Sequence, residues 1–166
     1  MKKGIIVAGF TAIGKTTLGN KYDNIIDIES SLYQWKYKKG MTLEEIETYK
    51  GKEGRTYNEE FPNNYFNAIL DARNKYDLIL TSMHWEILEE FEKNGIEYYL
   101  AYPKLNFADE IKKRCIDRGN SEEWSNKIKE KVFDWYPRLK DYSPKEILYL
   151  SKDEYLEDIL KKKNLI

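Results

Sequence analysis

Short apolar runs alternate with longer amphipathic stretches along this chain, and the alternation predicts strands and helices in turn. Runs that suit buried strands lie at 4–8, 24–28, 77–82, 96–102 and 146–150. Stretches with apolar residues three or four positions apart suit helices and lie at 15–22, 61–75, 84–95, 106–119, 121–139 and 151–163. Strands that alternate with helices are typical of βαβ units. We therefore expect a three-layer α/β fold with a parallel sheet of about five strands.

The alternation of strand-like and helix-like stretches is less clear between residues 30 and 65. Residues 30–40 are expected to form a helical segment closed by a glycine, and 42–50 a short helix with Thr42 as its N-cap. Residues 50–62 hold two glycines, a proline and few apolar side chains, which predicts a mobile loop. No linker or repeat divides the chain, so we expect one domain over residues 1–166 with a substrate-binding insert at about 30–65.

The residues after the first predicted strand match the phosphate-binding pattern G-x-x-x-x-G-K-[ST], and a predicted helix follows. In such a P-loop, backbone N–H groups and the helix N-terminus surround a polyphosphate. Lys15 is expected to reach the β and γ phosphates and to take part in catalysis, and the Thr16 hydroxyl to bind Mg²⁺. The residues expected to bind the nucleotide are Gly9, Thr11, Ala12, Ile13, Gly14, Lys15, Thr16 and Thr17.

Two acidic residues, Asp27 and Glu29, stand at the end of the second predicted strand. The carboxyl ends of parallel strands line the ligand crevice, and alternate residues of a strand point the same way. One of the two acids is expected to orient water bound to magnesium or to accept a proton from the acceptor. The alternative is a pair of solvated acids before a helix, with Ser30 as its N-cap.

The third predicted strand ends in Thr-Ser-Met-His, without the acid that motor and switch ATPases carry there, since Asp77 stands at the opposite end. An energy-coupled motor is therefore the least attractive class. Ser82 and His84 stand where polar groups would touch the γ-phosphate or the substrate. His84 is equally compatible with a first-turn helix residue that has no catalytic part.

A basic cluster follows the fourth predicted strand. Arg114 and Arg118 are four residues apart on one helix, and a Gly-Asn break follows them. We expect a helical lid at about 112–126 whose arginines close over the phosphates and exclude water. The alternative is a helix C-terminus that carries cations for its own stability.

The insert holds the candidates for acceptor binding. Aromatic stacking and pairing with a phosphate are expected from Tyr33, Trp35, Arg55 and Tyr57, with His84 beside them. Each of these is also compatible with an ordinary loop residue. A basic channel for a polynucleotide would join Lys36, Lys38, Lys39, Lys50 and Lys52.

The composition of the chain narrows the possible classes of protein further. The formal net charge is −1, which argues against a protein that coats nucleic acid, because such binding needs a basic excess. Cys115 is the single cysteine, so a reducing, cytoplasmic compartment is the simplest expectation. No apolar run approaches the roughly twenty residues that span a bilayer, and no membrane partner is expected.

The order of the P-loop, DIESS, a variable insert and an arginine-bearing helical segment resembles the nucleoside and nucleotide monophosphate kinase branch of P-loop proteins. GFTAIGKTTL, NIIDIESS, FPNNY, YDLILTSMH and RGNSEEW resemble, more narrowly, small nucleotide-kinase-like proteins of bacteriophages. The resemblance implies ATP and Mg²⁺ on Lys15 and Thr16, an acceptor in the insert, and lid arginines at Arg114 and Arg118. For a phage protein it also implies the host cytoplasm.

These features together predict an enzyme, an ATP-dependent phosphotransferase that moves a γ-phosphate to a nucleotide or nucleoside. Two alternatives stay open. The first is a kinase of a polynucleotide 5′-hydroxyl or of another small hydroxyl compound. The second is a nucleotide-binding regulatory module with little turnover. The sequence does not predict an oligomeric state.

Overall fold

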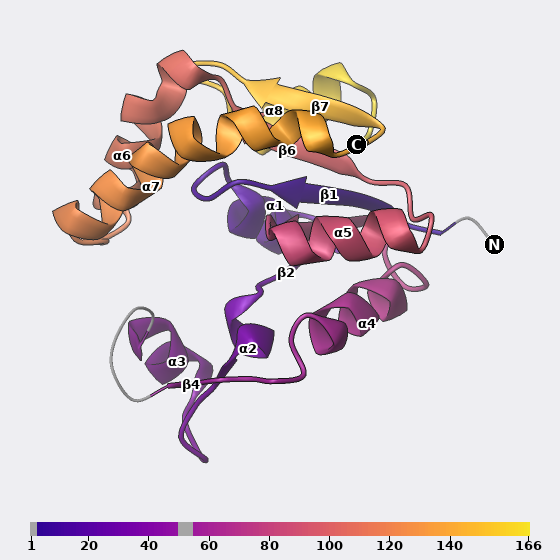
Figure 1. Ribbon diagram of the computed structural model, residues 1–166, viewed down its shortest axis with the longest axis vertical. Coiled ribbons are helices and arrows are strands. Elements are labelled where there is room, and N and C mark those ends of the chain that lie inside the picture. The colour runs from indigo at the N-terminus through magenta and orange to yellow at the C-terminus, as the bar shows by residue number, and fades with distance from the viewer. Residues whose placement is uncertain (1–2, 50–54) are drawn as a thin grey trace.

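Buried apolar strands form a parallel sheet in the computed structural model, which describes residues 3–49 and 55–166. The sheet has five strands in the order β2-β5-β1-β6-β7 (Figure 1). Their bounds are β1 Ile5–Gly9, β2 Ile25–Ile28, β5 Leu78–Ser82, β6 Tyr99–Pro103 and β7 Glu146–Leu150. The central strands are almost entirely buried, because helices cover both of their faces. The predicted α/β fold with about five parallel strands is confirmed.

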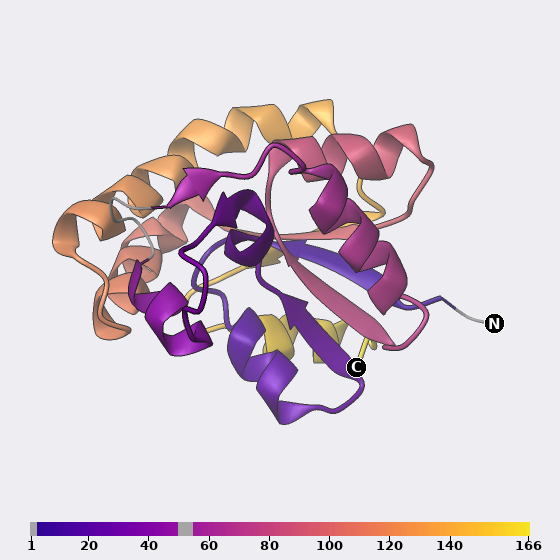
Figure 2. The same cartoon turned by 90° about the horizontal axis from the view of Figure 1, so that it is seen from below.

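Helices form the two outer layers. Figure 2 shows α1 and α8 on one face of the sheet, and α4, α5 and α7 on the other. Their bounds are α1 Lys15–Lys21, α4 Asn63–Ala72, α5 Trp85–Lys93, α7 Glu122–Trp135 and α8 Leu156–Lys162. Among the described residues, no helix combines the length and the apolar character needed to cross a membrane.

The strand register brings three chain segments to one edge of the sheet. Gly9 at the end of β1 is level with Ser82 of β5, and Ile28 of β2 is level with Thr81. The P-loop, the Glu29 segment and the residues after β5 therefore leave the sheet side by side. Asp77 lies before β5 at the opposite edge, where its carboxylate accepts a hydrogen bond from Asn24.

A helical hairpin projects beyond the sheet in Figure 1 and consists of α6 (Ala108–Asp117) and α7. Gly119 forms its turn with a φ of 97°, in the left-handed region that favours glycine. The Ser121 hydroxyl accepts a hydrogen bond from the Trp124 amide, as expected of an N-cap. Residues 112–126, the predicted lid, lie within this hairpin, and their closure over a ligand stays a prediction. Short 3-10 turns, Leu105–Phe107 and Tyr136–Asp141, flank the hairpin.

The insert differs from its prediction. The helical segment expected over 30–40 is only the short α2 (Ser31–Gln34), because the next residues form β3 (Trp35–Lys36). This strand pairs antiparallel with β4 (Thr56–Tyr57), where a loop was expected, and residues 50–54 lie outside the described part. The predicted short helix is α3 (Leu43–Tyr49), and its cap is confirmed, since Thr42 and Glu45 exchange backbone-to-side-chain hydrogen bonds.

Candidate functional site

The P-loop wraps around the ammonium group of its own lysine. Lys15 Nζ donates to the carbonyl oxygens of Phe10 at 2.7 Å and Gly9 at 3.1 Å. Gly14 has a φ of 99° and Ala12 a φ of 61°, so two residues of the turn are left-handed. For alanine this conformation costs free energy, and such strain gathers where a loop must hold an unusual shape. The turn leads directly into α1, so the partial positive charge of the helix N-terminus lies at the P-loop.

Thr16 is joined to one of the two predicted acids. Its hydroxyl donates to Asp27 Oδ2 at 2.9 Å, so the first turn of α1 and the end of β2 meet there. Close packing permits this meeting: a Cβ on Gly19 would lie only 3.0 Å from the Asp27 amide nitrogen. A hydroxyl and a carboxylate are hard oxygen ligands of the kind that Mg²⁺ prefers.

A network of neutral polar groups follows the second strand. The buried Ser30 hydroxyl lies 2.8 Å from His84 Nε2, and the Ser30 amide donates to Ser82 Oγ at 3.3 Å. The Tyr65 hydroxyl donates to the Ile28 carbonyl at 2.6 Å and accepts from the Ser82 amide at 2.9 Å. Burial raises the pKa of Tyr65 far above its ordinary value, so its hydroxyl stays protonated.

His84 stands at the N-cap position of α5 and is largely buried against this network. Burial lowers the pKa of its imidazole, because desolvation disfavours the charged ring. The charges of Glu86 and Glu29 raise this pKa, while those of Lys131 and Lys15 lower it. Glu29, the second predicted acid, thus lies within electrostatic reach of His84, as Lys15 does.

The two predicted lid arginines have different surroundings. Arg114 is buried, with its guanidinium 3.7 Å from the centre of the Tyr155 ring, and it donates to the Glu154 carbonyl at 2.8 Å. It also approaches the Ala12 carbonyl of the P-loop at 3.5 Å. Arg118 is exposed at the hairpin turn, where it donates to Asn120 Oδ1 at 2.7 Å. The contact of either arginine with phosphates stays a prediction.

Sequence reasoning missed Tyr155 and Lys131. Tyr155 packs against Gly14, whose added Cβ would lie 3.1 Å from its ring, and the next residue donates from its amide to the Ile13 carbonyl. Lys131 Nζ lies 5.2 Å from the ring centre of Trp135. That indole in turn packs edge-on against Phe10 of the P-loop, at 5.8 Å between centroids. For Lys131, the available sequence signal was Trp135, an aromatic residue one helical turn later.

Three of the predicted acceptor-binding residues, Trp35, Tyr57 and His84, lie in one row of rings. Trp35 and Tyr57 are 5.9 Å apart, Tyr57 and Phe61 are 6.4 Å apart, and Phe61 is 5.3 Å from the His84 ring. Arg55 stacks on Trp35 at 4.0 Å. Tyr33 packs beside this row, on the ring of Tyr65 at 5.3 Å. We call Trp35, Tyr57, Phe61 and His84 the aromatic row. The basic channel stays a prediction, since Lys36, Lys38 and Lys39 are exposed and Lys50 and Lys52 lie outside the described residues.

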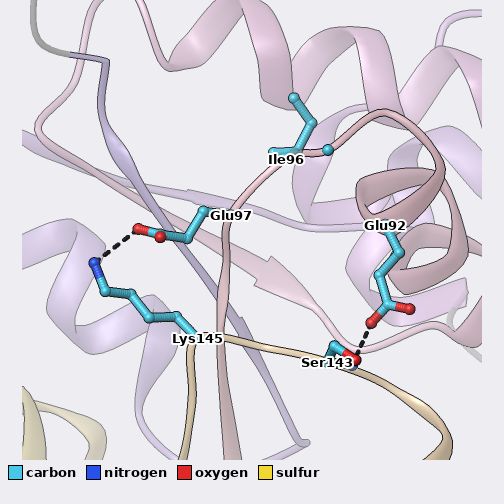
Figure 3. A pocket seen from close by; sticks show the side chains of 6 residues that line it. Glu92, Ile96, Glu97, Ser143 and Lys145 are labelled. Atoms are coloured by element: carbon cyan, nitrogen blue, oxygen red, sulfur yellow. Dashed lines mark hydrogen bonds and ion pairs between the residues drawn. The ribbon is translucent and has the colours of Figure 1, made fainter.

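Two shallow hollows lie away from these groups. One, of about 470 Å³, is lined by Glu92, Glu97, Ser143 and Lys145 (Figure 3). Its polar groups pair with one another: Lys145 binds Glu97 at 2.8 Å and the Ser143 amide donates to Glu92. The other, of about 440 Å³, lies at the amino-terminal edge of the sheet. Neither hollow includes a predicted site residue.

The strand order and the glycine-rich turn with its lysine define a three-layer α/β protein of the P-loop-like class. No family model matches the chain, and no curated protein matches it. Among solved structures it is similar to the tunicamycin resistance protein of Deinococcus radiodurans, with a TM-score of 0.56 and 11% identity over 100% of this chain and 98% of that one. It is also similar to an uncharacterized protein from Eubacterium ventriosum, with a TM-score of 0.53 and 12% identity over 99% and 98%. At such identities the similarity shows the fold alone.

Proposed function

We propose that this protein is an ATP-dependent phosphotransferase that uses Mg²⁺ and transfers the γ-phosphoryl group to a hydroxyl or phosphate of a small acceptor, a nucleoside or nucleotide. The observation that carries the proposal is the link between Thr16 and Asp27 beside a complete P-loop. This link supports a donor site in which the metal and the phosphates are held by adjacent groups of α1 and β2.

Each group has a role in the proposed reaction. Lys15 would exchange its carbonyl partners for the β and γ phosphate oxygens, and Thr16 and Asp27 would hold Mg²⁺ directly or through its water. The acceptor oxygen attacks the γ-phosphorus, the new O–P bond forms, and the bond to the bridging oxygen breaks so that ADP leaves. Glu29, close to His84, would accept the proton of a hydroxyl acceptor.

The hairpin offers further cations for the developing charge. The charges of Lys131 and Lys15 both lower the pKa of His84. The Lys131 ammonium group lies over the ring of Trp135, and that ring packs against Phe10 of the P-loop. This supports a role for Lys131 at the transferred group, beside the roles proposed for Arg118 and Arg114. Arg114 is the anchored member, since it is held by Tyr155 and Glu154.

ADP formation by the full chain tests the proposal. ATP and Mg²⁺ are incubated with nucleosides, nucleoside monophosphates, a 5′-hydroxyl oligonucleotide and simple sugars, with the Lys15→Ala variant in parallel. We expect at least one small acceptor to raise ADP formation above the water background, and only in the wild type. If the wild type binds ATP but none of the acceptors raises ADP formation, the regulatory module is favoured. A preference for the oligonucleotide would favour the polynucleotide kinase.

A further inference from the structure

The hydroxyl of Tyr65 joins the carboxyl ends of two neighbouring strands. It donates to the Ile28 carbonyl of β2 at 2.6 Å and accepts from the Ser82 amide of β5 at 2.9 Å. The two strands pair in parallel as far as Ile28 and Thr81, so the hydroxyl lies where their paired stretch ends. From there one segment continues into α2 and the other into α5. A single hydroxyl thus contacts both segments where they leave the sheet.

The ring of Tyr65 is enclosed by its neighbours. It projects from α4 and is fully buried. The rings of Tyr33 and Phe61 lie 5.3 Å and 6.0 Å from it, between centroids. Burial raises the pKa of the phenol far above its ordinary value, so the hydroxyl keeps the proton that it donates. Because it is fully buried, Tyr65 can act on a ligand only through the groups that it holds.

The β5 side of this contact leads to the P-loop lysine. Met83, the residue after Ser82, donates from its amide to the Gly9 carbonyl at 3.2 Å. The same carbonyl accepts a hydrogen bond from Lys15 Nζ at 3.1 Å. A short chain of bonds therefore runs from Tyr65 along the backbone after β5 to the ammonium group of Lys15.

The β2 side of the contact leads to Ser30 and His84. Ser30 lies two residues after the Ile28 carbonyl, and its amide donates to Ser82 Oγ at 3.3 Å. The buried Ser30 hydroxyl lies 2.8 Å from His84 Nε2. The position of the His84 ring therefore depends on how the two segments are held together.

The residue before Tyr65 holds the other end of the segment that follows β2. Asn64 Nδ2 donates to the Tyr33 carbonyl at 2.9 Å. Residues 28–33 are thus bound at both ends by adjacent side chains of α4, and Ser30 lies between these two points.

We propose, on the basis of the phosphoryl transfer proposed above, that Tyr65 is a positioning residue of this reaction. Its hydroxyl sets the separation between the segments after β2 and β5, and so fixes where Ser30 and His84 stand relative to Lys15. Without the hydroxyl, the carbonyl and the amide that it joins are left to each other, and the two segments shift. A displacement of about 1 Å near the reacting groups can lower a rate about a hundredfold, so the shift slows the transfer.

Tyr65→Phe tests the proposal, because it removes the hydroxyl and keeps the ring. Turnover is measured as acceptor-dependent ADP formation at saturating ATP and Mg²⁺, with the acceptor that the wild type uses best, and ATP binding is measured separately. We expect kcat to fall by about tenfold or more, with the Kd for ATP within about twofold of the wild-type value.

Tyr98→Phe is the matched control. Tyr98 is also buried, and its hydroxyl donates to Glu92 Oε1 at 2.9 Å, away from the segments that Tyr65 joins. Each variant loses one buried hydrogen bond, so both should lower the urea midpoint by similar amounts. Tyr98→Phe should nevertheless leave kcat within about twofold of the wild-type value. Equal losses of kcat in the two variants would show a loss of stability alone and would overturn the inference.

The NMR signals of the His84 ring test the same displacement without turnover. His84 is the single histidine of the chain, so its ring signals are assigned directly in the wild type and in both variants. We expect them to move in Tyr65→Phe and to stay in place in Tyr98→Phe. Unmoved signals or a wild-type kcat in Tyr65→Phe overturns the inference and leaves the proposed phosphotransferase intact. If no acceptor stimulates ADP formation by the wild type, the proposed function itself falls, and the His84 signals still show whether Tyr65 sets the position of this ring.

Discussion

The Thr16 hydroxyl donates a 2.9 Å hydrogen bond to Asp27 Oδ2, which ties the residue after the P-loop lysine to the end of the neighbouring strand. The Asp27→Asn variant should need more Mg²⁺ for half-maximal turnover, by about tenfold to a hundredfold, because the carboxylate charge is lost beside the metal. Turnover is measured as a function of free Mg²⁺. Asp23→Asn is the control, since Asp23 is exposed at the other end of β2. An unchanged magnesium dependence in Asp27→Asn would contradict the role of Asp27.

Gly19 allows α1 to approach β2 and so to hold Thr16 near Asp27. In Gly19→Ala the new Cβ would lie 3.0 Å from the Asp27 amide nitrogen and 3.1 Å from its Cβ. Alanine is favoured over glycine in a helix by about 1 kcal/mol, yet we expect a net loss of about 1 kcal/mol or more in the free energy of unfolding, because the layers must separate.

Urea denaturation checks this, with Asn20→Ala as the control on the exposed side of the same helix. Asn20→Ala should stabilise the protein by a few tenths of a kcal/mol or leave it unchanged. Stabilisation by both substitutions would show that the contact with Asp27 relaxes without cost.

Arg114 and Arg118 offer a direct comparison within one helix. Arg114→Lys loses the stacking on Tyr155 and the planar donor to the Glu154 carbonyl, and should lower the free energy of unfolding by about 1–3 kcal/mol. Arg118→Lys lies on the surface and should change it by no more than about 0.5 kcal/mol. Chemical denaturation of both variants measures the difference. Equal effects would mean that the Arg114 contacts contribute nothing to stability.

His84 is the single histidine of the chain, so its titration can be followed without overlap. Its folded pKa lies below the ordinary value of 6.5, because burial disfavours the imidazolium ion. Between the two values the unfolded chain binds more protons, so the free energy of unfolding should fall as the pH drops below about 6.5. This dependence should be weaker in His84→Gln.

An NMR titration of the His84 ring protons gives the folded pKa directly, and denaturation at about pH 7.5 and about pH 5.5 gives the slope. A midpoint above 6.5 would show that the charges of Glu29 and Glu86 outweigh burial, and the expected slope would then reverse.

Features encoded by local sequence were predicted well, and those that depend on distant partners were not. The apolar run at 146–150 is the strand β7, and the P-loop residues lie in the expected strand–turn–helix context. Trp35 was assigned to a helix because its pairing with Tyr57 lies across the insert. The spacing of Arg114 and Arg118 suggested equivalent lid residues, but Tyr155, far along the chain, buries only the first.

The most direct test of the proposed phosphotransferase follows the phosphoryl group itself. ATP labelled with ³²P at the γ position is incubated with Mg²⁺, the full chain and the preferred small acceptor, and the acceptor is isolated. We predict label in the acceptor with the wild type, none with ATP labelled at the α position, and none with Lys15→Ala. Label that appears only as inorganic phosphate, whatever the acceptor, would contradict phosphoryl transfer by this protein.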